Sequence, residues 1–118
     1  MTTTDHASVA QEFLTKQVEL LEAGDTAGLA QRYAEDAMFV RFDRTAVGRA
    51  AVKELFDDYL KQKPQLQGVD SLQISDNVIL YQAAENLSGV LVTAVGTLVF
   101  VNGLVWRQTV AFVDRPAG

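Results

Sequence analysis

Hydrophobic residues recur every three or four positions in the first part of the chain and form longer, strand-like runs in the second part. Between positions 8 and 23 the apolar side chains fall on one face of a helix, and the amide of Gln17 lies within that face. Ser8 followed by Gln11 is typical of a capping box, and Gly24 is typical of a helix end. The pattern predicts an amphipathic helix that starts at Ser8 and ends at Gly24.

Two more helices are expected downstream. Asp25 is a suitable N-cap for a short second helix, which would carry Leu29, Ala30 and Tyr33 inward. A third helix is expected over positions 48–60, where apolar residues return at helical spacing: Val52, Leu55, Phe56, Tyr59 and Leu60.

The remaining segments predict strands at positions 38–44, 69–74, 78–84, 90–101 and 104–113. Asn102-Gly103, between the last two, is a strong hairpin signal. Helices first and strands later indicate an α+β fold, with three helices packed on one face of a curved, mainly antiparallel sheet. Because the last two strands carry apolar residues on both faces, we expect a second copy of the chain to cover the other face. A homodimer through the sheet is therefore predicted.

Composition limits the possible partners. The 118 residues, of which 48% are hydrophobic, fit one domain over positions 1–118 with short flexible ends. A net charge of −5 without any basic cluster argues against a nucleic-acid partner. The chain has no cysteine and a single histidine, His6, which falls in the expected N-terminal tail. It therefore has no ligand set for a transition metal, and we expect neither a metal nor a cofactor.

The sequence also carries no targeting signal that we can identify. The residues from Met1 to His6 lack a basic start followed by an apolar stretch. The longest apolar segment, at 90–101, is interrupted by polar residues and is shorter than the roughly 20 residues of a membrane helix. A soluble, cytoplasmic protein that does not associate with membranes is expected.

Four segments carry a family resemblance: ELLEAGD at 19–25, YAEDA at 33–37, GRAAV at 48–52 and FVNGLV at 100–105. In this order they resemble the superfamily of nuclear transport factor 2, SnoaL-like polyketide cyclases and ketosteroid isomerases. The resemblance covers nearly the whole chain and implies the cone-shaped, cystatin-like α+β fold of that superfamily. These are scaffold motifs, and a shared fold does not by itself imply a shared activity.

The resemblance also locates the positions where ketosteroid isomerases keep their catalytic groups. Those enzymes use an aspartate base together with a tyrosine and a protonated aspartic acid. By spacing, the tyrosine position falls on Gln17, the base position on Arg41, and the buried acid on or beside Gly96. Arginine stays protonated at neutral pH and cannot accept a proton. The usual ketosteroid isomerase mechanism is therefore not expected here.

Comparison with two other activities of the superfamily gives weaker matches. The acid that SnoaL-like cyclases keep on the last strand lands near Val110. The acid of an epoxide hydrolase could correspond to Glu85, but its arginine partner would fall on Ala83. Glu85 also lies beside the turn at 86–89, so a solvated carboxylate is the simpler interpretation.

The resemblance implies a largely apolar cavity. It directs Asp43 and Val110 inward and implies a set of candidate ligand-binding residues: Gln17, Phe39, Arg41, Phe56, Tyr59, Trp106, Gln108 and Phe112. Structural roles compete for several of them. Arg41 could form a salt bridge with Asp43 or Glu35, the two glutamines could bind backbone groups, and Trp106 could belong to the core or an interface.

Three functional hypotheses follow. The first is a pocket that binds a mainly apolar ligand with one acidic or enolisable oxygen, held by Arg41. The second is an isomerase, cyclase, dehydratase or epoxide hydrolase that uses Asp43 or Glu85 together with Arg41. The third is a non-catalytic dimeric interaction module. Whether the protein is an enzyme stays open at this point.

Overall fold

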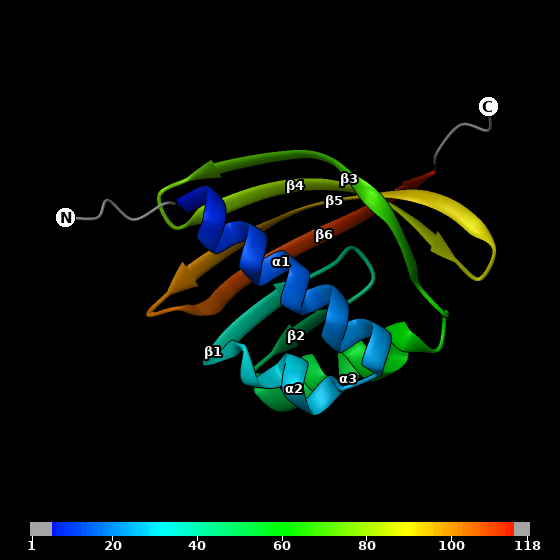
Figure 1. Cartoon of the computed structure of the whole chain (residues 1–118). Helices are drawn as coiled ribbons and strands as arrows, with labels where there is room; N and C mark the ends of the chain where they lie inside the picture. Colours follow the sequence, from blue (N-terminus) through cyan, green and yellow to red (C-terminus); the bar gives the residue numbers. More distant parts are fainter. Residues whose placement is uncertain (1–5, 115–118) are drawn as a thin grey trace.

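The computed structural model describes the backbone of residues 6–114 and the side chains of residues 9–114. The predicted flexible ends lie largely outside these residues. The elements in chain order are α1 (His6–Ala23), α2 (Thr26–Gln31), β1 (Tyr33–Val40), β2 (Thr45–Val47), α3 (Arg49–Leu60), β3 (Gln65–Ser75), β4 (Val78–Leu87), β5 (Val90–Val101) and β6 (Leu104–Asp114). Figure 1 shows their arrangement.

The helix boundaries follow local sequence signals at most ends. Gly24, with φ of +69°, comes directly after α1, and the Asp25 side chain caps α2 by accepting a hydrogen bond from the Gly28 amide at 2.9 Å. The predicted start at Ser8 is wrong, because α1 already begins at His6. A capping motif marks a possible start, and the helical backbone here continues through two residues before it.

Tyr33 belongs to a strand, and its predicted place on the second helix is wrong. The helix α2 ends at Gln31, and Tyr33 opens β1 in register with Val105 of β6. This pairing joins residues far apart in sequence, so the local pattern could not indicate it. At its other end β1 stops at Val40, and residues 41–44 turn into the short strand β2, which the sequence did not predict.

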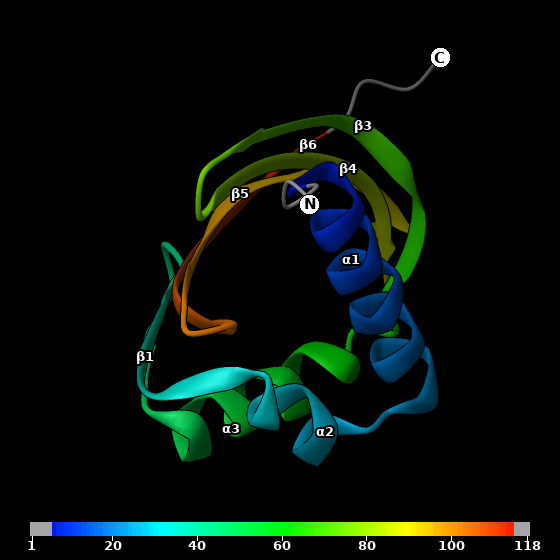
Figure 2. The same ribbon diagram turned by 60° about the vertical axis from the view of Figure 1, so that its left-hand side comes forward.

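The sheet has six strands in the order β2-β1-β6-β5-β4-β3. It is a mixed sheet, because β1 runs parallel to β6 while the other neighbours pair antiparallel. The β5–β6 hairpin turns at Asn102-Gly103, where both residues have positive φ, as predicted. Figure 2 shows the sheet curving around the interior, with α1 crossing its concave side and α2 and α3 lying along another side.

The core is densest where α2 and α3 meet β1 and β6. Its largest fully buried side chains are Tyr33, Leu29, Leu55, Val52 and Val105. The Tyr33 ring packs against those of Phe39 and Phe56, with centroids 6.3 and 5.8 Å apart. No helix in residues 6–114 is both long and apolar enough to cross a membrane.

Candidate functional site

A cavity of about 340 Å³ lies between α1, α3 and the concave face of the sheet. Its volume is at the lower end of the range for small-molecule pockets, about 300 to 1,000 Å³. Seven of the eight candidate ligand-binding residues line it: Gln17, Phe39, Arg41, Phe56, Tyr59, Gln108 and Phe112. Most of the wall is apolar, and two groups of polar side chains interrupt it.

The first polar group starts at Arg32, which follows α2. Its guanidinium lies over the Phe13 ring, 3.8 Å from the centroid, and donates to the Phe13 carbonyl oxygen at 3.0 Å. It also donates to Oε1 of Gln17 at 2.8 Å, and Nε2 of Gln17 donates to the Tyr33 hydroxyl at 3.4 Å. Gln17 is therefore held between a charged donor and a phenol.

The same chain of hydrogen bonds continues across the sheet. The Tyr33 hydroxyl donates to Oε1 of Gln108, whose Nε2 donates to the Tyr81 hydroxyl at 3.1 Å. Tyr81 in turn donates to the Thr109 carbonyl oxygen at 3.2 Å. We call the side chains of Arg32, Gln17, Tyr33, Gln108 and Tyr81 the central network. Among the described side chains, every buried polar atom has a hydrogen-bond partner.

Burial keeps the phenols of the central network neutral at physiological pH. It raises the pKa of Tyr81 to about 12 and the pKa of Tyr33 further still. Burial lowers the pKa of Arg32, but an arginine keeps its charge in proteins. The central network therefore does not titrate near neutral pH.

Gly96 makes room for Tyr81. The two residues are cross-strand neighbours in β5 and β4, and the Tyr81 ring occupies the space that a side chain on Gly96 would need. A Cβ atom at Gly96 would also overlap the Thr109 carbonyl oxygen. At the position that the resemblance gives to a buried acid, this chain therefore places a phenol from the neighbouring strand.

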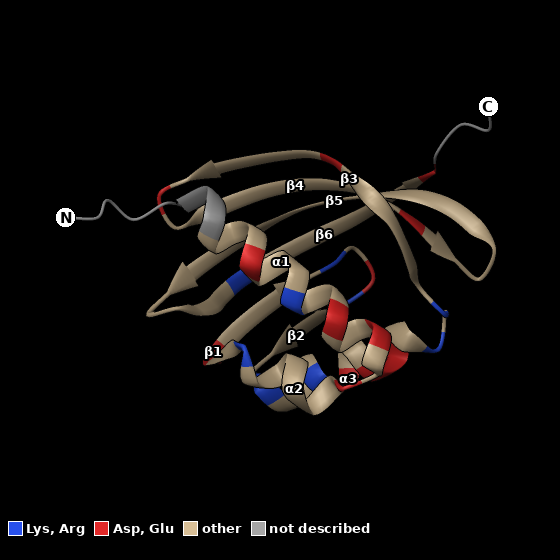
Figure 3. Ribbon diagram, in the orientation of Figure 1, with Lys and Arg blue, Asp and Glu red and all other residues tan. Residues whose placement is uncertain are grey.

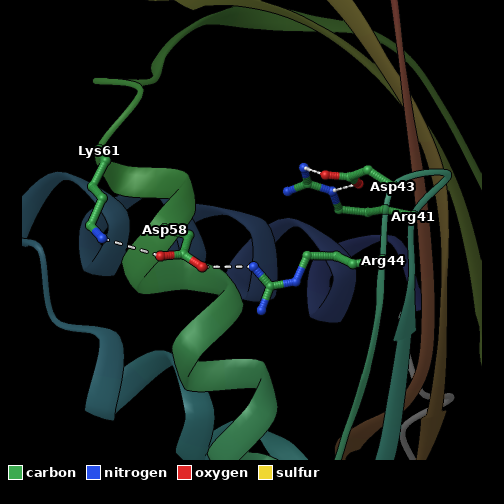
Figure 4. Close-up of polar contacts among 5 residues, drawn as sticks. All are labelled: Arg41, Asp43, Arg44, Asp58 and Lys61. Atoms are coloured by element: carbon green, nitrogen blue, oxygen red, sulfur yellow. Dashed lines mark hydrogen bonds and ion pairs between the residues drawn. The ribbon is translucent and has the colours of Figure 1, made fainter.

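The second polar group lies where β1 ends. Arg41 lines the cavity and its side chain is 12% exposed, whereas that of its partner Asp43 is 61% exposed. Nε and Nη2 of Arg41 donate to the two carboxylate oxygens of Asp43 at 2.9 and 2.8 Å. Figure 4 shows this pair apart from the contacts that Asp58 of α3 makes with Arg44 and Lys61. Arg41 thus has both predicted features, a place in the cavity wall and a salt bridge with Asp43.

Asp43 does not line the cavity, so the inward orientation that the resemblance implies is wrong. The strand ends at Val40, so the alternation that would align Asp43 with Phe39 stops before it. The hydrogen bonds from Arg41 lower the pKa of Asp43, which keeps this carboxylate ionised. Glu35, the other partner considered for Arg41, lies 3.9 Å from Arg49 instead.

Glu85 lies inside the cavity wall and not in the nearby turn. It is partly buried and accepts a hydrogen bond from the Tyr59 hydroxyl. Burial raises the pKa of the Glu85 carboxyl, and the Tyr59 hydrogen bond opposes that shift. Burial and the neighbouring Glu85 carboxylate raise the pKa of Tyr59, which stays a neutral donor. We call Arg41, Asp43, Tyr59 and Glu85 the mouth group.

Trp106 lies outside the cavity, so its predicted inward orientation is wrong. Val99 of β5 pairs with Arg107 and Phe100 pairs with Val105, which leaves Trp106 as the extra residue of a β-bulge. The bulge removes Trp106 from the face that Gln108 shares with the cavity. Its ring stacks with the Arg107 guanidinium, 3.7 Å from the centroid, and borders a separate surface groove.

Sequence reasoning missed Arg32, Tyr33 and Tyr81 as parts of the site. Tyr33 was expected on a helix, and the partners of Arg32 and Tyr81 are distant in sequence. Val110 and Ala83, where relatives would carry an acid or an arginine, line the cavity as apolar residues. Among the residues that the structure describes, no group of His, Asp or Glu side chains is arranged to hold a metal ion.

Comparison with known proteins identifies the fold. No protein-family model and no curated protein sequence matches the chain. A nuclear transport factor 2-like protein of unknown function from Burkholderia xenovorans matches with a TM-score of 0.80 and 22% identity, over 96% of this chain and 89% of that one. A nuclear transport factor 2-like protein from Anabaena variabilis matches with a TM-score of 0.81 and 14% identity, over 98% and 96%.

A proposed ketosteroid isomerase from Kribbella flavida matches with a TM-score of 0.73 and 22% identity, over 94% of this chain and 82% of that one. The chain therefore has the nuclear transport factor 2-like fold, and the resemblance to that superfamily is confirmed at the level of fold. Identities this low do not carry an activity from one protein to another.

Proposed function

We propose that this protein binds a small, mainly apolar molecule with one acidic or enolisable oxygen, and that Arg41 holds this oxygen. The observation that carries the proposal is a guanidinium in the wall of a mostly apolar cavity. A charged donor among apolar side chains forms strong hydrogen bonds to an anionic oxygen, because little water competes there.

The hydrogen bonds of Arg41 support this role. Arginine carries five N–H donors, and Asp43 accepts one each from Nε and Nη2, so three remain that can serve a ligand. The Phe112 ring lies 5.6 Å from the guanidinium, and the rings of Phe39 and Phe56 line the same cavity. An aromatic or alicyclic acid fits these surroundings.

The proposal is tested by titrating wild type and Arg41→Ala with naphthoic acid and naphthalene, using calorimetry at pH 7. We expect the substitution to weaken naphthoic acid binding about tenfold or more, as the loss of a charge-assisted hydrogen bond predicts. Naphthalene binding should change little. Arg44→Ala is the matched control, because Arg44 lies in the same turn but pairs with Asp58 and does not line the cavity. Equal naphthoic acid affinities for wild type and Arg41→Ala would refute the role of Arg41.

A second candidate function is acid–base catalysis, and the position of Glu85 favours it. A partly buried carboxyl with a raised pKa keeps its proton to a higher pH than an exposed one and is suited to transfer it. An isomerase, cyclase, dehydratase or epoxide hydrolase could use Glu85 with Arg41. Asp43 is less suited to this role, because its side chain is exposed to solvent. Exchange of an enolisable ligand proton for deuterium, followed by NMR, would reveal this activity. If the protons next to the carbonyl of a bound ketone exchange no faster than in buffer, the acid–base activity is refuted.

We also propose that two copies of the chain associate through the outer face of the sheet. Leu80, Thr97 and Thr109 form one cross-strand row of that face, and Leu80 is 49% exposed. Figure 3 shows that charged residues gather over the helices and turns, while most of β4 and β5 is uncharged. Light scattering that gives the mass of one chain at micromolar concentration would contradict the homodimer.

Nothing in the cavity favours a pure interaction module, because the side chains leave about 340 Å³ unfilled. The cytoplasmic location and the lack of nucleic-acid and membrane partners stay predictions from the sequence.

A further inference from the structure

We infer that the centre of the cavity selects a ligand oxygen that accepts hydrogen bonds, such as a ketone oxygen, because Gln17 and Gln108 turn their N–H groups toward the ligand. The inference rests on the proposed function in one respect, that a ligand occupies this cavity. It adds a second oxygen to that ligand, apart from the acidic one at Arg41. The predicted ligand class is therefore an apolar keto acid.

The direction of the central network is fixed at its first end. Arg32 carries only donors, so the atom of Gln17 that meets it must be the amide oxygen. The amide nitrogen of Gln17 then faces the Tyr33 hydroxyl, to which it donates. Tyr33, having accepted this bond, donates its own hydrogen to the next member.

The direction is fixed independently at the other end. The Thr109 carbonyl can only accept, so Tyr81 must donate to it. The atom of Gln108 that meets Tyr81 must then be a donor, which is the amide nitrogen, and the amide oxygen of Gln108 faces Tyr33. Both ends give the same direction, so neither amide can flip without losing its hydrogen bonds.

The fixed direction decides which amide atoms a ligand can meet. Both glutamines line the cavity. Their amide oxygens are held by Arg32 and Tyr33, which do not line it, whereas the Gln108 nitrogen donates to Tyr81, which does. The Gln17 nitrogen donates to Tyr33, so only its second hydrogen is available to a ligand. Each amide nitrogen carries two hydrogens, and the central network uses one of them. One N–H on Gln17 and one on Gln108 are left for the ligand, and an oxygen acceptor fits both.

The test compares two ligands in a cycle of substitutions. One ligand is a tetrahydronaphthoic acid, and the other is the tetralone carboxylic acid that differs from it only by the ketone. We expect the ketone to improve binding to wild type about fivefold, in line with one to two added hydrogen bonds. In Gln17→Glu this ratio should fall to about twofold or less, because a carboxylate still accepts from Arg32 but has no N–H to donate.

One control and one further cavity variant show whether the ratio of the two affinities depends on the amide N–H groups. Gln11→Glu adds the same charge on the exposed face of α1 and should keep the full ketone advantage. Gln108→Glu is a second variant that removes the other N–H donor, with urea unfolding used to confirm that it folds. A ketone that gives no advantage in wild type, or the same advantage in both cavity variants, would overturn the inference.

The ketone test and the test of Arg41 give independent results. Arg41→Ala should weaken both acids equally and leave the ketone ratio unchanged. A normal ratio with no effect of Arg41→Ala would remove the proposed role of Arg41 and keep the central donors. The opposite pattern would keep the proposed function and remove this inference.

Discussion

The central network and the mouth group are both polar, but they differ in what can change within them. The central network runs in one direction from Arg32 to the Thr109 carbonyl, and none of its members titrates near neutral pH. The mouth group contains two carboxyls, and the exposed Asp43 can exchange its partner with a ligand. The central network therefore offers hydrogen bonds in fixed directions. The mouth group, by contrast, can change its protonation and its ion pairing.

The largest effect is expected from breaking the centre. Tyr33→Phe removes a hydroxyl that joins Gln17 to Gln108 in a fully buried position. The free energy of unfolding should fall by about 1–3 kcal/mol, because buried amide atoms lose their partner. Urea unfolding measures this change.

The matched variant at the mouth is Tyr59→Phe, which removes the phenol that binds Glu85. We expect a smaller loss of stability, because Glu85 is only partly buried and can gain hydration. Equal decreases in the free energy of unfolding for Tyr33→Phe and Tyr59→Phe would contradict the proposed difference between the central network and the mouth group.

A pH-dependent effect is expected from Glu85→Gln. Burial raises the pKa of Glu85 in the folded state above its ordinary value, so the folded state binds this proton more tightly than the unfolded state. The resulting stability is present at low pH and is lost as the pH rises from the ordinary value through the raised one. Relative to wild type, Glu85→Gln should therefore gain stability as the pH rises above the ordinary pKa of a glutamate. Urea midpoints at a series of pH values measure the gain, and Glu54→Gln on the exposed side of α3 is the matched control for the substitution.

The smallest effect is expected from Asp43→Asn, which releases Arg41 from its exposed partner. Stability should change by less than about 1 kcal/mol, as for most surface ion pairs. The affinity for naphthoic acid should rise about twofold to fivefold, because the ligand carboxylate no longer lies near the negative charge of Asp43. Asp58→Asn, which breaks the Arg44 pair instead, should leave this affinity unchanged. A weaker affinity in Asp43→Asn would mean that Asp43 positions Arg41 and does not compete for it.

The sequence predicts those parts of the fold that local signals determine. Gly24 stops α1, Asn102-Gly103 forms the hairpin, and the spacing at 48–60 gives α3. Tyr33 was misplaced because its end of β1 pairs with Val105 of β6, which is far away in the sequence. The strand β2 has three residues and no pattern long enough to detect.

The site could be predicted only in part, for a related reason. Spacing within the resemblance locates Gln17 and Arg41 on the cavity wall. The contacts that hold Gln108 cannot be predicted this way, because its partners Tyr33 and Tyr81 are 75 and 27 residues away. Trp106 was misplaced because one bulge residue reverses the face of a strand, and periodicity does not reveal a bulge.

Gly96 has a consequence for how this protein could evolve. An aspartic acid at this position would collide with the Tyr81 phenol and with the backbone of β6. A substitution of Gly96 by aspartic acid alone would therefore force Tyr81 or β6 to shift. An acid at this position therefore requires changes in the neighbouring strands as well.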